Sequence, residues 1–307
     1  MKYTIVPFSE QNIAHFPVLY RAVYGKEIAL EHVTRKFDTK YLIDGFFGFF
    51  AYDGSKPIAF YGAIPVQMCY KNKTEIAAQS VNTMTHPDYR GKGLFIKLAK
   101  MTYEKMAEAG IRFVWGFPNQ HSEPTFLNKL DWEYQHRLEG YVIKIQRNYI
   151  RRVLNKIPSL KTEYIDNAEK LFLPYKTENA SRPIATEAVT VFHTKEYYDY
   201  KSFSGNFAIQ IEGCCFFINL KNGCWIGSAS ATDEAEFRQS FQKFKKLCQK
   251  ARISEIMIQT SPGTILSDLM KSEKTFQFES WIAGYKNFNS NFPLEKLQFS
   301  LGDADVF

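Results

Sequence analysis

The feature that most constrains the fold is a change of periodicity on either side of a glycine-containing turn. Residues 74–85 follow an extended pattern, and from Leu94 the apolar residues recur at helical spacing until Gly110. The turn between them contains Arg90–Gly93, read as Arg-Gly-Lys-Gly. The pattern therefore predicts a strand, a tight turn and a long amphipathic helix, which is an α/β arrangement.

This turn has the chemistry of a diphosphate cradle. Gly91 and Gly93 let the backbone approach a ligand and let successive N–H groups point the same way. The following helix adds unpaired N–H donors and the positive end of its dipole, and Arg90 and Lys92 add charge. A Gly-x-Gly turn alone is equally typical of a plain strand-to-helix connection. The segment has neither Gly-Lys-Ser/Thr nor a three-glycine dinucleotide fingerprint.

A longer stretch carries a family resemblance. The segment HPDYRGKGLFIKLAKMTYEKMAEAG resembles the coenzyme-binding motif of the GNAT superfamily of N-acetyltransferases, Arg/Gln-x-x-Gly-x-Gly/Ala, and Arg90 and Gly93 fit it. Phe95 stands where a small residue is usual, and this variant resembles the enhanced-intracellular-survival type subgroup. The resemblance implies an α/β GNAT fold, a mixed and mostly antiparallel sheet with flanking helices, and acetyl-CoA as co-substrate.

The same resemblance implies a set of cofactor-binding positions. In the superfamily the strand before the motif offers backbone groups to the pantetheine arm, and the acyl chain enters a notch before the next strand, here 113–117. An asparagine after that strand often contacts the cofactor. The implied cofactor-binding residues are Thr83, Met84, Thr85, Arg90, Gly91, Lys92, Gly93, Leu94, Phe95 and Asn119.

Several residues are candidates for proton transfer. Many relatives carry a tyrosine as acid on the helix after Asn119, and Leu127 occupies that position here. His121 and Glu123 can titrate, although both are equally typical of a helix start. Asn82 could orient a water.

The C-terminus offers a further candidate. By resemblance to the enhanced-intracellular-survival type, the terminal carboxylate of Phe307 would act as the base; a frayed tail is the default for a terminus. No cysteine or serine has the surroundings of an activated nucleophile.

Length and pattern predict two domains. The 307 residues suit two domains of about 150 each. We predict an acyl-CoA-binding domain at 1–146, a linker region at 147–183 and a second, smaller α/β domain at 184–307. The second half repeats the order of elements in the first, so a GNAT-like duplication is a hypothesis. Residues 189–198 are predicted as a strand.

Charge and cysteine content exclude several classes. The net charge of +7 is spread along the chain, and its densest basic run, Lys243–Lys250, has the spacing of a solvated helix face. We therefore predict no nucleic-acid partner. The five cysteines show no metal-ligand spacing, so no metal is predicted. No long apolar block occurs, which predicts a cytoplasmic protein without a membrane partner.

These observations together predict an N-acyltransferase. It would move an acetyl or other acyl group from acyl-CoA to a primary amine of a small molecule or peptide, by direct attack. Two alternatives stay open: a non-catalytic acyl-CoA sensor or scaffold, and a Fem-type aminoacyl-transferase, although the coiled helical arm of that type is absent from the sequence. The acceptor is not predicted, and a homo-oligomer is left open.

Overall fold

A computed structural model describes residues 3–146, 158–178, 187–220, 223–231 and 233–307. These residues form two compact units. The first unit contains Met1–His136, Ala188–Phe192 and Trp281–Leu297, and the second contains Arg137–Glu187, His193–Ser280 and Gln298–Phe307. The predicted linker, 147–183, lies partly outside the described residues.

The first unit is built on a sheet of order β1-β2-β3-β4-β5-β12. All neighbours in it are antiparallel except β4 and β5, which run parallel. A short strand, β7 (Thr190–Val191), also pairs with β3. Besides β7, the elements of the first unit are β1 (Thr4–Pro7), α1 (His15–Tyr24), α2 (Leu30–Phe37), β2 (Phe47–Asp53), β3 (Lys56–Tyr70), β4 (Lys73–Thr85), η1 (Pro87–Tyr89), α3 (Leu94–Glu108), β5 (Phe113–Gly116), α4 (Glu123–Lys129), the end of β12 (Phe276–Asn287) and η4 (Leu294–Lys296).

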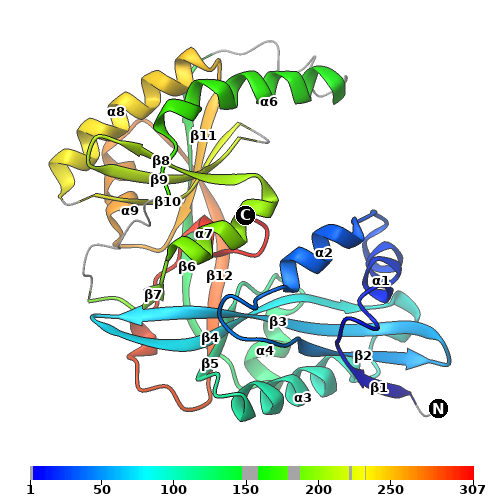
Figure 1. Ribbon diagram of the computed structural model, residues 1–307. Helices are drawn as coiled ribbons and strands as arrows, with labels where there is room; N and C mark the ends of the chain where they lie inside the picture. The colour runs from blue at the N-terminus through cyan, green and yellow to red at the C-terminus, as the bar shows by residue number, and fades with distance from the viewer. Residues whose placement is uncertain (1–2, 147–157, 179–186, 221–222, 232) are drawn as a thin grey trace. The chain divides into compact units, whose positions relative to one another are not determined.

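Helices cover both faces of this sheet, which explains why β2 is apolar at nearly every position. Successive side chains of a strand point to opposite faces. Phe49 packs with the residues of α3, whereas the ring of Phe50 lies 4.6 Å from that of Phe60, on the face covered by α1 and α2. Figure 1 shows α1 and α2 on one side of β2 and β3, and α3 on the other.

The second unit has a sheet of order β6-β11-β10-β9-β8. Here β10 and β11 run parallel and the other pairs antiparallel. Its elements are β6 (Glu133–Lys144, whose first residues belong to the first unit), α6 (Pro158–Phe172), η2 (Leu173–Tyr175), α7 (Lys195–Lys201), η3 (Ser202–Ser204), β8 (Asn206–Ile211), β9 (Cys214–Asn219), β10 (Cys224–Ser230), α8 (Glu234–Lys250), β11 (Glu255–Thr260), α9 (Ile265–Ser272), the start of β12 and η5 (Leu301–Asp303).

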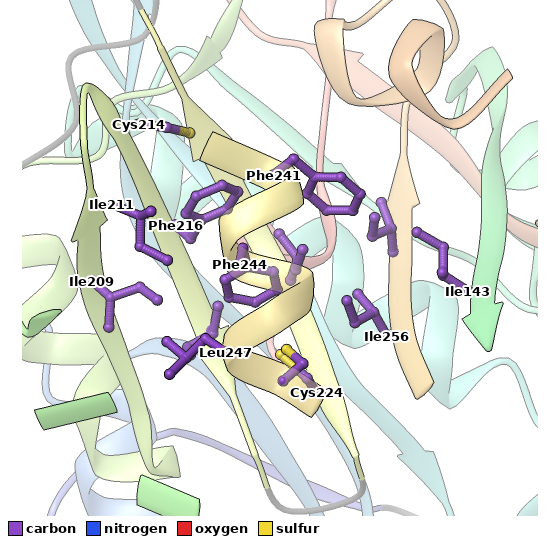
Figure 2. Close-up of a cluster of buried hydrophobic side chains, with 14 of the residues drawn as sticks. Ile143, Ile209, Ile211, Cys214, Phe216, Cys224, Phe241, Phe244, Leu247 and Ile256 are labelled. Carbon is purple, nitrogen blue, oxygen red and sulfur yellow. The ribbon is translucent and has the colours of Figure 1, made fainter. Parts of the chain in front are cut away.

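The core of the second unit lies between α8 and this sheet (Figure 2). Phe241, Phe244 and Leu247 of α8 recur at helical spacing and are buried against isoleucines of β8 and β11. The ring of Phe244 stacks on Phe216 of β9 at 4.8 Å. Lys243, Lys246 and Lys250 of α8 are exposed, as the sequence pattern predicts, whereas Lys245 is partly buried with its Nζ 5.5 Å from the ring centre of Phe241.

One predicted strand differs from the structure, and the two units do not follow the predicted boundaries at 146 and 184. Residues 189–198 are not one strand, because α7 begins at Lys195; Thr194 caps it by accepting from the N–H of Tyr197. Threonine is a residue that favours helix N-caps, so the sequence itself carries this signal. In addition, Trp281–Leu297, assigned from sequence to the second domain, belongs to the first unit because Gly284–Asn287 pair with β5.

Candidate active site

The turn between β4 and α3 has the geometry that its glycines require. Gly91 and Gly93 lie in the left-handed region, with φ of 75° and 73°. A Cβ added at either glycine would meet nothing within 4 Å. The conformation of the backbone, rather than crowding, therefore demands glycine, and open space lies in front of the turn.

The first turn of α3 is open to an anion. Gly93 is the N-cap, no side chain caps the helix, and its first turn contains no acidic residue. Arg90 and Lys92 are exposed beside it, and Lys92 Nζ lies 4.5 Å from the ring centre of Tyr89. Unpaired N–H groups, the helix dipole and two cations favour negative charge at this end. These residues fit a diphosphate group.

The adjoining strands separate next to this turn. β4 pairs with β5 only at Ala78–Val114 and Gln79–Trp115, and β4 continues to Thr85. No strand among the described residues pairs with Val81–Thr85 on the side of β5. We call this region the first split. Thr83, Met84 and Thr85, predicted as cofactor-binding residues, lie along its edge and leave backbone groups free of a strand partner there.

A lysine of α2 holds a bulge in β4 at the first split. The pairing of β3 with β4 shifts register next to Asn82, which has a left-handed φ of 48°. Lys36 Nζ donates to Asn82 Oδ1 at 2.6 Å, and Lys36 is only 6% exposed. Sequence reasoning named Asn82 and missed Lys36. The available signal was a lysine on the apolar face of α2, next to Phe37 and one turn from Val33.

A buried polar chain lies beside the first split. The Tyr61 hydroxyl donates to Ser80 Oγ at 2.7 Å and lies 3.1 Å from the Tyr103 hydroxyl, which accepts from Trp132 Nε1 at 2.9 Å. Burial raises the pKa of Tyr61 and Tyr103 far above the usual value for tyrosine. Both phenols therefore stay protonated at neutral pH.

Phe95 packs into this region of the first unit. Its ring stacks on Tyr61 at 6.0 Å and meets Phe126 edge-on at 5.1 Å. The large side chain at a position usually small in the family is thus accommodated by aromatic neighbours. Leu94, the other residue predicted beside it, is buried in the same apolar cluster.

The loop after β5 brings three predicted residues together. Asn119 Oδ1 accepts from the N–H groups of His121 at 2.9 Å and Ser122 at 3.1 Å, so this side chain shapes the start of α4. His121 is exposed and Glu123 is half-buried in the first turn of α4. Leu127, at the position of the family's tyrosine acid, packs against the apolar cluster.

Phe307 belongs to the second unit and is 2% exposed. Its ring lies 5.4 Å from that of Phe217 in β9. The preceding residues are held by α7 and the segment before it: His193 Nε2 lies 2.7 Å from Asp303 Oδ1, and Lys201 Nζ donates to the Ala304 carbonyl at 2.6 Å. The tail is therefore anchored rather than frayed.

Neither a metal-binding cluster nor a membrane-spanning helix is found within the described ranges. Within them, no group of three or more His, Cys, Asp or Glu side chains is arranged to hold a metal ion. No helix there is both long and apolar enough to cross a bilayer.

Comparisons with known proteins agree with this architecture. Residues 5–135 match the family model of an acetyltransferase (GNAT) domain. A GCN5-related N-acetyltransferase from Kribbella flavida has a similar structure, with a TM-score of 0.62, 13% identity, and coverage of 93% of this chain and 71% of that one. A probable N-acyltransferase from Enterococcus faecalis V583 has a TM-score of 0.62 and 12% identity over 96% and 75% of the two chains.

A third solved structure is N-myristoyltransferase from Saccharomyces cerevisiae with bound myristoyl-CoA. Its TM-score is 0.53 with 11% identity, over 97% of this chain and 84% of that one. At such identities these likenesses show the fold. Among curated protein sequences, none matches the chain. The predicted GNAT fold is confirmed, and the N-terminal part of this enzyme, residues 5–135, is an acetyltransferase domain of the GNAT type.

Proposed function

We propose that the chain is an N-acyltransferase that moves an acetyl or other acyl group from acyl-CoA to a primary amine of a small molecule or peptide. The observation that carries this proposal is the open first turn of α3 beside the first split. An anionic coenzyme would be held at the turn, and its thioester arm would follow the edge of β4. The acceptor class and the length of the acyl chain belong to the proposal.

The residues present fit acetyl-CoA as the co-substrate. Gly91, Lys92, Gly93 and Arg90 would hold the diphosphate through backbone N–H groups and charge. N–H groups of Thr83–Thr85 would bind the pantetheine arm and polarise the thioester carbonyl. Acetyl-CoA brings the activated acyl group, and the protein binds and orients it against the amine.

Direct attack by the amine is favoured over a covalent enzyme intermediate. A nucleophilic cysteine needs a thiolate, hence a lowered pKa and access to solvent. Burial instead raises the pKa of Cys214 and Cys248, and both thiols are fully buried. The thiols therefore stay protonated, and the acceptor amine is the simplest nucleophile.

Four groups are candidates for proton transfer: Asn82, His121, Glu123 and the Phe307 carboxylate. Asn82 already accepts from Lys36, which favours a positioning role over water activation. His121 and Glu123 share the loop that precedes α4. Replacing Asn82, His121 and Glu123 by alanine in turn, and extending the chain by one glycine after Phe307, would rank the four candidates through kcat at saturating acetyl-CoA.

The enhanced-intracellular-survival subgroup remains a prediction, since it rests on the Phe95 motif and on a base at Phe307.

Calorimetry of acetyl-CoA binding tests the proposal first. The Arg90→Glu/Gly93→Trp variant should lose binding, because it reverses a charge and blocks the turn. The matched control is Lys100→Glu/Gly110→Trp, which reverses a charge in the middle of α3 and adds the same bulk just beyond its C-terminal end; Gly110 also has a left-handed φ, of 80°, and open space around it. The cradle is supported if the native chain and the control variant bind acetyl-CoA and the Arg90→Glu/Gly93→Trp variant does not. If the native chain does not bind, the turn is structural and the proposal is wrong.

Acceptor screening would follow with the native enzyme. Release of coenzyme A would be measured against amino sugars, polyamines, small amines and peptides with a free N-terminus. We also propose that the enzyme works in the cytoplasm without a nucleic-acid or membrane partner, because its basic residues are dispersed.

A further inference from the structure

A cavity lies within the second unit and shares no residue with the α3 turn. It has a volume of about 620 Å³ and lies between the end of β6, one side of α8 and the segment that enters β12. This volume is within the range of small-molecule sites. Four lysines and one glutamate line it: Lys144, Lys245, Lys246, Lys274 and Glu273.

One ion pair fixes a wall of this cavity. Glu273 accepts from Lys245 at 2.8 Å and from Gln242 Nε2 at 3.0 Å. The side chains of Lys245 and Glu273 are only 18% and 16% exposed, so the pair is partly shielded from water. Its two charges cancel, and it holds the start of the β12 segment against α8.

The remaining lysines leave the cavity positively charged. Lys246 of α8 and Lys274 of the segment that enters β12 are exposed, and Lys144 makes a long contact of 3.8 Å with Glu255. Cations gathered around one concave surface repel one another and raise the local concentration of anions. The sequence pattern predicted this run of α8 as a solvated face; in the structure, part of that face lines a cavity.

An apolar surface lies in the same cavity. Phe276 is 67% exposed, and the partly buried side chains of Val142 and Ile145 also line the cavity. An exposed phenylalanine gains from any partner that removes its ring from water. A simple inorganic anion would leave this surface uncovered, whereas an anion with an apolar body would use both parts of the wall.

We propose that this cavity binds an organic anion that carries an aromatic or aliphatic body. The charged group would lie between Lys246 and Lys274, and the apolar body would cover Phe276. Lys245 and Glu273 would keep the walls in place without contributing net charge. This site is independent of the acyl-transfer proposal, because none of its residues takes part in that chemistry.

The test uses 8-anilinonaphthalene-1-sulfonate, a fluorescent aromatic anion, with the full-length protein and saturating coenzyme A. Lys246→Glu/Lys274→Glu should weaken binding by about tenfold or more, since it reverses two charges at the site. Lys250→Glu is the matched control: it lies one helical turn from Lys246 on α8, is exposed and does not line the cavity. Phe276→Ser should weaken binding by a smaller factor. N-phenyl-1-naphthylamine, which has the same rings without the sulfonate, should bind poorly.

Lysine footprinting provides a second measurement that needs no variant. Acetylation of the native protein by acetic anhydride should slow at Lys246 and Lys274 when the sulfonate probe is present, and stay unchanged at Lys250. The proposal is overturned if the probe does not bind in the presence of coenzyme A, if Lys250→Glu weakens it equally, if the neutral analogue binds as tightly, or if no lysine of the cavity is protected.

Discussion

Both units contain a parallel pair of strands joined by a long helix, but the space beside that pair is open in the first unit and filled in the second. In the first unit α3 connects β4 to β5, and α4 follows β5; in the second unit α8 connects β10 to β11, and α9 follows β11. Each central strand also has a register shift just beyond its parallel pairing, at Asn82 in β4 and at Gly227 in β10. The two units therefore share one scaffold.

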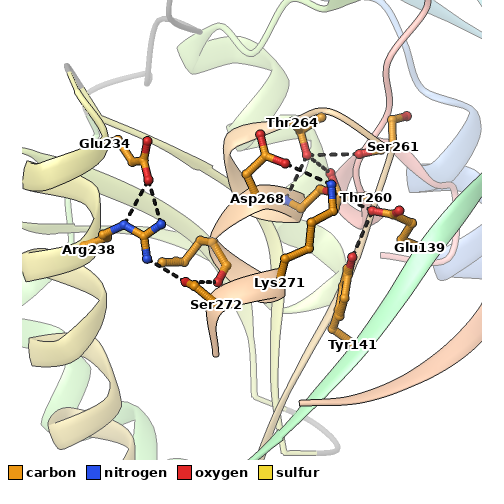
Figure 3. Close-up of polar contacts among 12 residues, drawn as sticks. Glu139, Tyr141, Glu234, Arg238, Thr260, Ser261, Thr264, Asp268, Lys271 and Ser272 are labelled. Atoms are coloured by element: carbon orange, nitrogen blue, oxygen red, sulfur yellow. Dashed lines mark hydrogen bonds and ion pairs between the residues drawn. The ribbon is translucent and has the colours of Figure 1, made fainter. Parts of the chain in front are cut away.

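The helix ends differ in charge and capping. α3 begins after Gly93 with no side-chain cap, beside Lys92. α8 begins after Asp233, whose carboxylate accepts from the N–H of Glu236, and its first turn carries acidic residues. One of them, Glu234, binds Arg238 (Figure 3). An acidic cap satisfies the helix donors and repels a phosphate, so α8 lacks what makes α3 a cradle.

The spaces between the strands also differ. Pairing of β10 with β11 ends at Ile226 and Ile258. Beyond it the C-terminal tail fills the space: the Ser261 N–H donates to the Phe299 carbonyl at 2.8 Å, and the ring of Phe307 lies against Gly227. Figure 3 shows that the loop after β11 is closed by its own threonines, with Thr260 and Thr264 hydroxyls 2.8 Å apart.

This difference teaches that a shared fold does not imply a shared site. The first unit leaves donors and a strand edge open, and the second satisfies the same groups with its own chain. Under the proposed function, we therefore expect one coenzyme per chain, held in the first unit.

The largest expected effect comes from Gly93→Val. A β-branched residue is strained at its φ of 73° and would change the turn that faces the coenzyme. Acetyl-CoA affinity should fall more than about 100-fold, an effect of roughly 3 kcal/mol or more by calorimetry. Gly263→Val is the matched control, since Gly263 has a φ of 71° with equally open surroundings in the second unit. Equal losses in both variants, or two coenzymes bound per native chain, would break the comparison.

The next effect concerns the anchored tail. Asp303 is 4% exposed and accepts from His193 and from Ser300, so Asp303→Ala leaves buried donors without partners. The free energy of unfolding should fall by about 2–3 kcal/mol in denaturant titrations, with coenzyme affinity unchanged. Asp199→Ala, which removes an exposed carboxylate paired with Lys195, should cost under about 1 kcal/mol. A loss of coenzyme binding in Asp303→Ala would show that the units are not separate in this function.

A smaller effect is expected at the bulge of β4. Lys36→Met removes the donor that holds Asn82 and should weaken acetyl-CoA binding by about tenfold, from the loss of one charge-assisted hydrogen bond of roughly 1.5 kcal/mol. Lys40→Met, at an exposed lysine 3.5 Å from Glu10, serves as the control. If both variants bind equally well, Lys36 is only a packing residue, and the bulge needs no support.

The smallest effect is a pH dependence of stability. Burial raises the pKa of Tyr103 in the folded protein, whereas the unfolded phenol ionises near pH 10. Stability is therefore fully present below pH 10 and is lost as pH rises above it, by about 1.4 kcal/mol per buried tyrosine at pH 11. Between pH 9 and 11, the free energy of unfolding of Tyr103→Phe should fall by about 1 kcal/mol less than that of the native protein. An unchanged pH slope would show that this phenol ionises freely.

Much of the first unit could be predicted because its signals are local. The two glycines, the change of period and the apolar stripe of α3 are properties of neighbouring residues, and the structure reproduces them. In the second unit the helical spacing of Lys243–Lys250 in α8 was predicted on the same grounds, whereas α7 was predicted as part of a strand. The roles of the cofactor and catalytic residues stay predictions.

Long-range contacts could not be predicted in this way. The hydrogen bond from Lys36 to Asn82 joins residues 46 apart, and the chain from Tyr61 through Tyr103 to Trp132 joins β3, α3 and the loop before β6. The contact of His193 with Asp303 joins residues 110 apart. Such partners leave no periodic trace in a single sequence.

The sequence by itself determined an α/β chain with a glycine turn able to cradle an anion, because backbone conformation and amphipathic spacing are set by nearby residues. Only the tertiary structure decided that the first split stays open, while the corresponding space beside β10 and β11 is filled by the C-terminal tail. Whether a strand edge is free depends on which distant segment packs against it, and that choice is made by the burial of side chains such as Phe307 across the whole fold.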